Sequence, residues 1–260
     1  MADDVRLRVS VVQTESSLDP AVNRARLGEA AELAPASDLV VFPEAFARDF
    51  GKPGSDLADF AEPLDGPFVT RLREVSDQHD VAVLAGMFER SGDGGLPFNT
   101  LVLADRGELT TYRKIHLYDS FGYRESDTLG AGVTEPVVAD VRGVPVGLMT
   151  CYDLRFPELG RALVDAGAQV LAVPAAWVAG ERKAKHWTTL LRARAIENLV
   201  YVVGAAQCGP RYTGHSLVVS PNGDEIVAAD NSETVLHVSL DLAEVATARE
   251  ANPSLANRRL

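Results

Sequence analysis

The chain has 260 residues, of which 46% are hydrophobic, and a formal net charge of −12 from 25 basic and 37 acidic residues. This hydrophobic content suffices for a sizeable core, and the length is compatible with a single α/β domain spanning residues 1–260. The acidic excess argues against nucleic acid or an anionic membrane surface as a partner. Two cysteines are too few for a disulfide framework in a chain of this length. Residues 1–4 carry no apolar export signal, and no apolar run reaches the 18 residues that a membrane span needs. We therefore expect a cytoplasmic protein.

Apolar runs alternate with helical patterns along the whole chain. We expect strands at residues 5–12, 39–43, 81–88, 99–104, 108–112, 144–150, 170–173, 201–206, 216–220, 226–227 and 234–240. Helices are expected to begin at Pro20, to span 67–79 and 158–166, and to end near Asn198. Two alternating halves, each with helices to cover one face of a sheet, predict a layered α/β sandwich.

Cys151 stands where the predicted strand 144–150 gives way to a helical pattern. The partial positive charge at a helix N-terminus favours thiolate over thiol, so this position is typical of a nucleophilic cysteine. A buried cysteine that acts as a small hydrophobe is the alternative. We assign that packing role to Cys208, which closes the apolar run 201–207.

Glu44 and Lys114 also stand at the ends of predicted strands. Glu44 follows the apolar run 38–43, where a partly desolvated carboxylate is suited to general-base work. Lys114 shares one strand face with Tyr112 and His116 at period two. A lysine directed at a cleft can stabilise the negative charge on an attacked carbonyl oxygen. Taken singly, each residue could instead be a solvated surface residue.

Three segments of the chain together resemble the nitrilase, or carbon–nitrogen hydrolase, superfamily. They are Phe42-Pro43-Glu44, Tyr112-Arg113-Lys114 and Cys151-Tyr152-Asp153-Leu154-Arg155-Phe156-Pro157-Glu158. The resemblance continues through 180–209 and the tail around Pro253, and is greatest to the branch with omega-amidase and deaminated-glutathione amidase. It implies a four-layer αββα sandwich of the nitrilase type that pairs into homodimers.

The resemblance implies roles for four residues. Glu44 would be the general base, Lys114 the cation beside the oxyanion, and Cys151 the nucleophile that forms a thioester. Glu125 is the best match to the family's second glutamate. The implied reaction releases ammonia from the terminal amide of a small carboxylic acid, with no metal or other cofactor. An N-carbamoyl-amine hydrolase or a nitrilase would use the same triad, and a non-catalytic binding protein on this fold is a further alternative.

Three further residues are candidates for substrate binding. The backbone N–H of Tyr152 would complete the oxyanion site. Arg155 offers a planar fork for a carboxylate, so we expect a carboxylate-bearing amide as the small-molecule partner. Arg155 could instead pair with Asp153 or Glu158. Trp177 stands where the amidase branch usually has phenylalanine, and would make the pocket wall bulkier.

Overall fold

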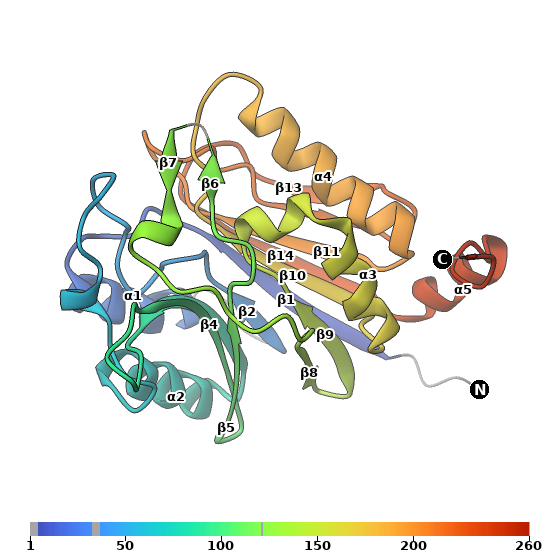
Figure 1. Ribbon diagram of the computed structural model, residues 1–260. Coiled ribbons are helices and arrows are strands. Elements are labelled where there is room, and N and C mark those ends of the chain that lie inside the picture. The colour runs from blue at the N-terminus through green and yellow to red at the C-terminus, as the bar shows by residue number, and fades with distance from the viewer. Residues whose placement is uncertain (1–4, 33–36, 121, 260) are drawn as a thin grey trace.

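Two six-stranded sheets lie face to face in the computed structural model, which describes residues 5–32, 37–120 and 122–259 (Figure 1). The first sheet has the order β14-β1-β2-β3-β4-β5, with β1, β2 and β3 parallel and the other pairs antiparallel. Its strands are β1 (Arg6–Gln13), β2 (Leu39–Val41), β3 (Ala82–Glu89), β4 (Phe98–Asp105), β5 (Glu108–Arg113) and β14 (Thr234–Asp241).

The second sheet has the order β13-β12-β11-β10-β9-β8. Strands β9, β10 and β11 are parallel. Strand β8 pairs antiparallel with β9, β12 with β11, and β13 with β12. The strands are β8 (Val138–Val141), β9 (Val144–Leu148), β10 (Val170–Ala175), β11 (Tyr201–Ala206), β12 (Leu217–Val219) and β13 (Glu225–Ala228). A small separate hairpin pairs β6 (Asp119–Ser120) with β7 (Tyr123–Arg124).

Helices cover the outer face of each sheet. Helices α1 (Pro20–Glu32) and α2 (Pro67–His79) lie on the first sheet, and α3 (Pro157–Asp165) and α4 (Lys183–Asn198) lie on the second (Figure 1). The predicted four-layer αββα sandwich is therefore confirmed. Helix α5 (Ala243–Ala251) lies to one side near the C-terminus, and the short 3-10 helices are η1 (Ala58–Phe60), η2 (Glu125–Asp127) and η3 (Cys151–Arg155).

The period-two alternation of the strands explains how both faces of a sheet are buried. In β2, Leu39 and Val41 join the core between the two sheets, whereas Val40 joins the core beneath α1 and α2. All three side chains are 0% exposed. Strands buried on both faces read as continuous apolar runs, which is why the sequence predicts them well.

The structure differs from the sequence-based expectations at several elements. Helix α5 and strands β6, β7 and β8 were not predicted, and these strands are only two to four residues long. The strand expected to carry Lys114 ends at Arg113, although the Lys114 N–H still donates to the Asn99 carbonyl at 2.8 Å. Residues 1–4, on which the expectation of no export signal rests, lie outside the described residues.

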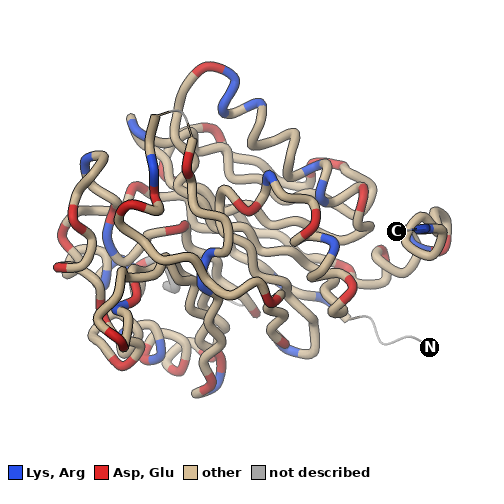
Figure 2. Tube along the Cα trace, viewed as in Figure 1, with Lys and Arg blue, Asp and Glu red and all other residues tan. Residues whose placement is uncertain are grey.

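Within the described ranges, we find no helix with the length and apolar character needed to cross a membrane. Lys and Arg (blue) and Asp and Glu (red) are scattered along the trace in Figure 2, and the buried strands β2, β10 and β11 carry neither.

Candidate active site

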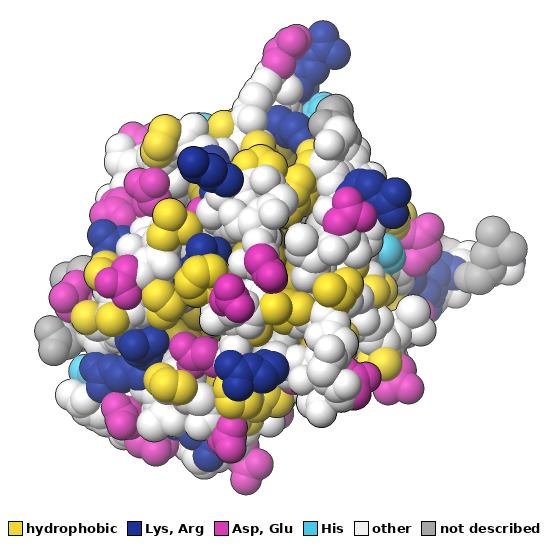
Figure 3. Space-filling view, turned by 60° about the vertical axis from the view of Figure 1, so that its left-hand side comes forward, with side chains coloured by type: hydrophobic (Ala, Val, Ile, Leu, Met, Phe, Trp, Pro, Cys, Tyr) yellow, Lys and Arg dark blue, Asp and Glu magenta, His cyan; other side chains and the backbone are white. Residues whose placement is uncertain are grey.

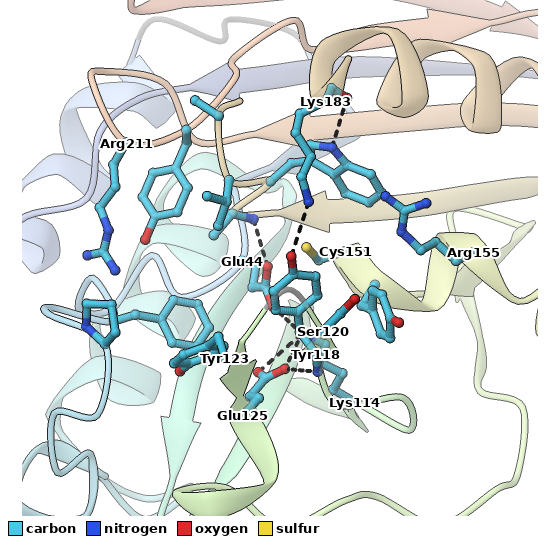
Figure 4. A pocket seen from close by; sticks show the side chains of 18 residues that line it. Glu44, Lys114, Tyr118, Ser120, Tyr123, Glu125, Cys151, Arg155, Lys183 and Arg211 are labelled. Carbon is cyan, nitrogen blue, oxygen red and sulfur yellow. Dashed lines mark hydrogen bonds and ion pairs between the residues drawn. The ribbon is translucent and has the colours of Figure 1, made fainter. Parts of the chain in front are cut away.

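A cavity of about 360 Å³ opens where strands of both sheets end. Its lining comes from the segments that follow β2, β5, β9, β10 and β11. Ligand sites in α/β proteins gather at the carboxyl ends of strands because the chain turns into loops there. All the predicted site residues line this one cavity (Figure 4): Glu44, Lys114, Glu125, Cys151, Tyr152, Arg155 and Trp177.

A buried ion cluster forms one wall of the cavity. Lys114 Nζ donates to Glu44 Oε1 at 2.9 Å and to Glu125 Oε2 at 2.8 Å. The three side chains are at most 2% exposed. Burial disfavours the charged lysine, but the adjacent Glu125 and Glu44 outweigh it and hold the pKa of Lys114 well above its usual value. Lys114 therefore carries a fixed positive charge at the site.

Backbone geometry holds Glu44 in this cluster. Its Oε2 accepts a 2.7 Å hydrogen bond from the Ala176 N–H, which follows β10 in the other sheet. A Cβ atom on Gly86 would lie 2.5 Å from the Ala45 nitrogen and 2.8 Å from the Glu44 Cα. Glycine at this position of β3 therefore allows the turn that carries Glu44 to pack against the strand.

Cys151 is the first residue of η3 and has a φ of +47°. This is the left-handed region, which non-glycine residues adopt rarely and which is common at functional sites. Burial and then the charge of Glu44 raise the pKa of the Cys151 thiol well above its usual value, against the lowering effect of Lys114. This direction opposes the thiolate that a helix N-terminus alone would favour, so attack by the sulfur needs a neighbouring base to take its proton.

Arg155 lines the cavity and makes neither of the ion pairs considered for it. Its guanidinium is 4.9 Å from the centre of the Trp177 ring, and among the described residues it pairs with neither Asp153 nor Glu158. Asp153 accepts hydrogen bonds from other groups. The Trp177 indole N–H donates to the Lys183 carbonyl at 3.0 Å. The half-buried Tyr152 ring packs at right angles to Tyr118.

Several residues at the site were not predicted from the sequence. The Asn99 side-chain amide bridges Glu44 and Glu125, at 2.7 and 3.1 Å. Lys183 Nζ donates to the Tyr118 hydroxyl at 3.1 Å across the cavity, and Arg211 lines the opposite side (Figure 4). A buried asparagine in the apolar strand β4 was the one available signal. Lys183 follows a run of exposed residues, 179–182, and Arg211 stands in a loop, so neither position is distinguished from surface by a sequence pattern.

Basic side chains outnumber acidic ones in the cavity lining although the whole chain is acidic. Arg155, Lys183 and Arg211 line it, Arg211 in an ion pair with Asp49, and the two carboxylates of the lining, Glu44 and Glu125, are both engaged by Lys114. Figure 3 shows hydrophobic side chains in the middle of one face, with Lys and Arg side chains beside them. In the described parts of the chain, no three His, Cys, Asp or Glu side chains are grouped as a metal site would require. The arrangement combines a thiol, a carboxylate and a fixed cation. These are the nucleophile, the base and the oxyanion-stabilising charge that acyl transfer requires.

A family model described as carbon-nitrogen hydrolase matches residues 8–250. The chain belongs to this family, which confirms the membership of the nitrilase superfamily expected from the sequence. It is accordingly an enzyme that hydrolyses carbon–nitrogen bonds, and its relatives include a deaminated glutathione amidase and an omega-amidase.

Three similar proteins illustrate the relationship. A hydrolase of Mycobacterium tuberculosis is 41% identical over 272 residues, covering 97% of this chain and 95% of the relative. Deaminated glutathione amidase of Escherichia coli O157:H7 is 40% identical over 224 residues, covering 85% and 84%. A carbon–nitrogen hydrolase superfamily protein of Xanthomonas campestris, solved with an arsenic adduct in its active site, has a TM-score of 0.90 and 31% identity, covering 98% of each chain.

Proposed function

We propose that the protein hydrolyses the terminal amide of a small carboxylic acid through a thioester on Cys151 and releases ammonia. The observation that carries the proposal is the convergence of Cys151, Glu44 and Lys114 at the wall of one cavity. An amide carbonyl is a poor electrophile, so its cleavage needs a nucleophile, a base and a charge that stabilises the oxyanion.

The proposed reaction has two halves. Glu44 takes the Cys151 proton as the sulfur attacks the carbonyl carbon, and Lys114 with the Tyr152 N–H stabilises the oxyanion. Glu44 then passes the proton to the amide nitrogen, the C–N bond breaks, and ammonia leaves. Water, deprotonated by Glu44, attacks the thioester carbonyl. The sulfur leaves, takes the proton back from Glu44, and the acid is released. Glu125 holds Lys114 in place throughout.

The substrate we propose carries a carboxylate in addition to the amide. Arg155 lines the cavity with no ion pair to Asp153 or Glu158, and it stacks against Trp177. A guanidinium fork pairs bidentately with a carboxylate. Similarity to a deaminated glutathione amidase supports the same class of substrate. We further propose that residues 1–260 act as one domain, in the cytoplasm, and as a homodimer.

Ammonia release from a panel of amides tests the proposal. The panel holds succinamate, alpha-ketoglutaramate, deaminated glutathione, neutral aliphatic amides, carbamoyl amino acids and simple nitriles, with Cys151→Ala as the blank. Release from the carboxylate-bearing amides, absent in the variant, is expected. Carbon dioxide released together with ammonia would favour the carbamoyl hydrolase, and acid from a nitrile alone would favour the nitrilase. No Cys151-dependent release would favour a bulkier substrate than the panel holds, accommodated beside Trp177, or a binding role.

A further inference from the structure

Asp153 is a completely buried carboxylate that accepts four hydrogen bonds. Oδ2 accepts from the Tyr112 hydroxyl at 2.6 Å and from the Thr150 N–H at 2.9 Å. Oδ1 accepts from the His116 N–H at 3.0 Å and from His116 Nδ1 at 2.7 Å. Since an ionised carboxylate only accepts, Nδ1 carries the imidazole proton. Neither Asp153 nor any of its three partner residues lines the substrate cavity.

The partners of Asp153 come from the two segments that carry the oxyanion lysine and the nucleophile. Tyr112 and His116 stand two residues before and two residues after Lys114, and Thr150 immediately precedes Cys151. One carboxylate thus joins both sides of the Lys114 segment to the turn that presents the thiol. Stacking of the His116 ring on Phe156, with centroids 3.7 Å apart, adds a second contact between the same segments.

The turn at Cys151 needs such support. A φ of +47° at a residue with a side chain is strained, and it persists only where the surrounding structure over-determines it. The Thr150 N–H and the Asp153 N–H, which donates to the Thr150 carbonyl at 2.9 Å, close the turn around Cys151 from both directions. The Asp153 side chain makes one of these two bonds.

We propose that Asp153 is a positioning residue that sets the placement of Cys151 and the Tyr152 N–H relative to the Lys114 ammonium. The proposal rests on the proposed amide hydrolysis, in which these three groups act on one carbonyl. Catalysis of this kind depends steeply on geometry, because a misplacement of about 1 Å can cost about 100-fold in rate. Asp153 reaches the substrate only through the groups that it holds.

Asp153→Asn tests this with little change in volume. Asn offers one acceptor oxygen and one NH₂ group, so in either orientation the NH₂ faces a backbone N–H, that of Thr150 or that of His116. One of the two segments must therefore shift. We expect kcat to fall about 100-fold, with KM for the carboxylate-bearing amide within about threefold, because Arg155 is untouched. Tyr112→Phe removes one donor and keeps the carboxylate, so a smaller loss is expected.

Asp38→Asn is the matched control. Asp38 is also held by a backbone N–H and a side chain, both of Arg8, but it lies away from the cavity. This variant is expected to lose stability without loss of kcat. If Asp153 has a purely structural role, Asp153→Asn and Asp38→Asn should behave alike, and the activity of each should be proportional to its folded fraction. That outcome, or full kcat in Asp153→Asn, would overturn the proposal.

A crystal structure of Asp153→Asn separates this proposal from the proposed function. A changed Cys151 φ or a displaced Lys114 is expected, whether or not the wild type hydrolyses any amide of the panel. An unchanged site in that structure would reject the positioning role. Absence of turnover in the wild type would reject the proposed function instead.

Discussion

Lys114 Nζ lies 2.8 and 3.1 Å from the two carboxylate oxygens of Glu125, and both side chains are almost completely buried. Taking two charges out of water is costly, and the cost is recovered only where geometry and additional hydrogen bonds are good. Here Glu125 also accepts bonds from Asn99 and from the Tyr118 N–H, the latter at 2.6 Å. Glu125 therefore anchors the lysine and the following loop at once.

The first prediction concerns that carboxylate. Glu125→Gln keeps its size but removes one of the two negative charges beside Lys114. We expect kcat to fall by about 10- to 100-fold, and the free energy of unfolding to fall by about 2 kcal/mol. Steady-state kinetics and urea denaturation measure the two. Asp127→Asn in the same loop is the control, since its ion pair with Arg124 is exposed and surface pairs contribute little. Equal kcat for wild type and Glu125→Gln would contradict the role.

A second prediction separates the two cysteines. Cys151→Ala is expected to lower kcat at least about a thousandfold, because no other group can form the thioester. Cys208→Ala, at a buried position outside the cavity lining, is expected to retain kcat. Intact-protein mass spectrometry after a rapid acid quench should detect an acyl adduct in the wild type and in Cys208→Ala alone. An adduct that survives in Cys151→Ala would refute the assignment.

A third prediction tests Arg155 as the carboxylate anchor. Charge-assisted hydrogen bonds contribute about 1.5–3 kcal/mol, so Arg155→Ala should raise KM for succinamate by about 10- to 100-fold. A neutral amide of the same chain length should show no such change. Arg192→Ala is a matched control, because Arg192 pairs with Glu225 away from the cavity. If Arg155→Ala affects both amides equally, Arg155 shapes the loop and does not bind the carboxylate.

A fourth prediction concerns alkaline stability. Burial raises the pKa of Cys151 well above 9.0 and that of Cys208 from 9.0 to about 11, and burial followed by the charge of Asp153 raises that of Tyr112 well above 10.0. The folded chain therefore keeps these protons after the unfolded chain has lost them. Their stabilisation is complete below about pH 9 and is lost as the pH rises above it.

Thermal unfolding between pH 7 and pH 11 measures this loss. The melting temperature should be level up to about pH 9 and then decrease. In the double variant Cys151→Ala, Cys208→Ala the decrease should begin later, near pH 10, where the tyrosines of the unfolded chain start to ionise. A melting temperature that rises between pH 9 and pH 11 would contradict the pKa directions.

The predicted strands agree with the structure where both faces of a strand are buried. Strands such as β10 and β11 are continuous apolar runs and were found from them, whereas β8 is short and its residues alternate in exposure. Lys114 and His116 were expected on one strand face with Tyr112 because period-two alternation continues past Arg113, the last residue of β5. That alternation alone does not reveal that the chain leaves the sheet there.

The amino-acid sequence by itself determined the layered α/β architecture, the chain order Glu44, Lys114, Cys151, and the family that this order indicates. Residue type and the period-two pattern of apolar residues are local along the chain, so the sequence reveals them without the structure. Only the tertiary structure decided that Glu44 and Glu125 share Lys114, that burial and Glu44 raise the pKa of the Cys151 thiol, and that Asp153 joins the two segments beside it. Desolvation and charge proximity depend on residues far apart in the chain, and these come together only when the two sheets pack.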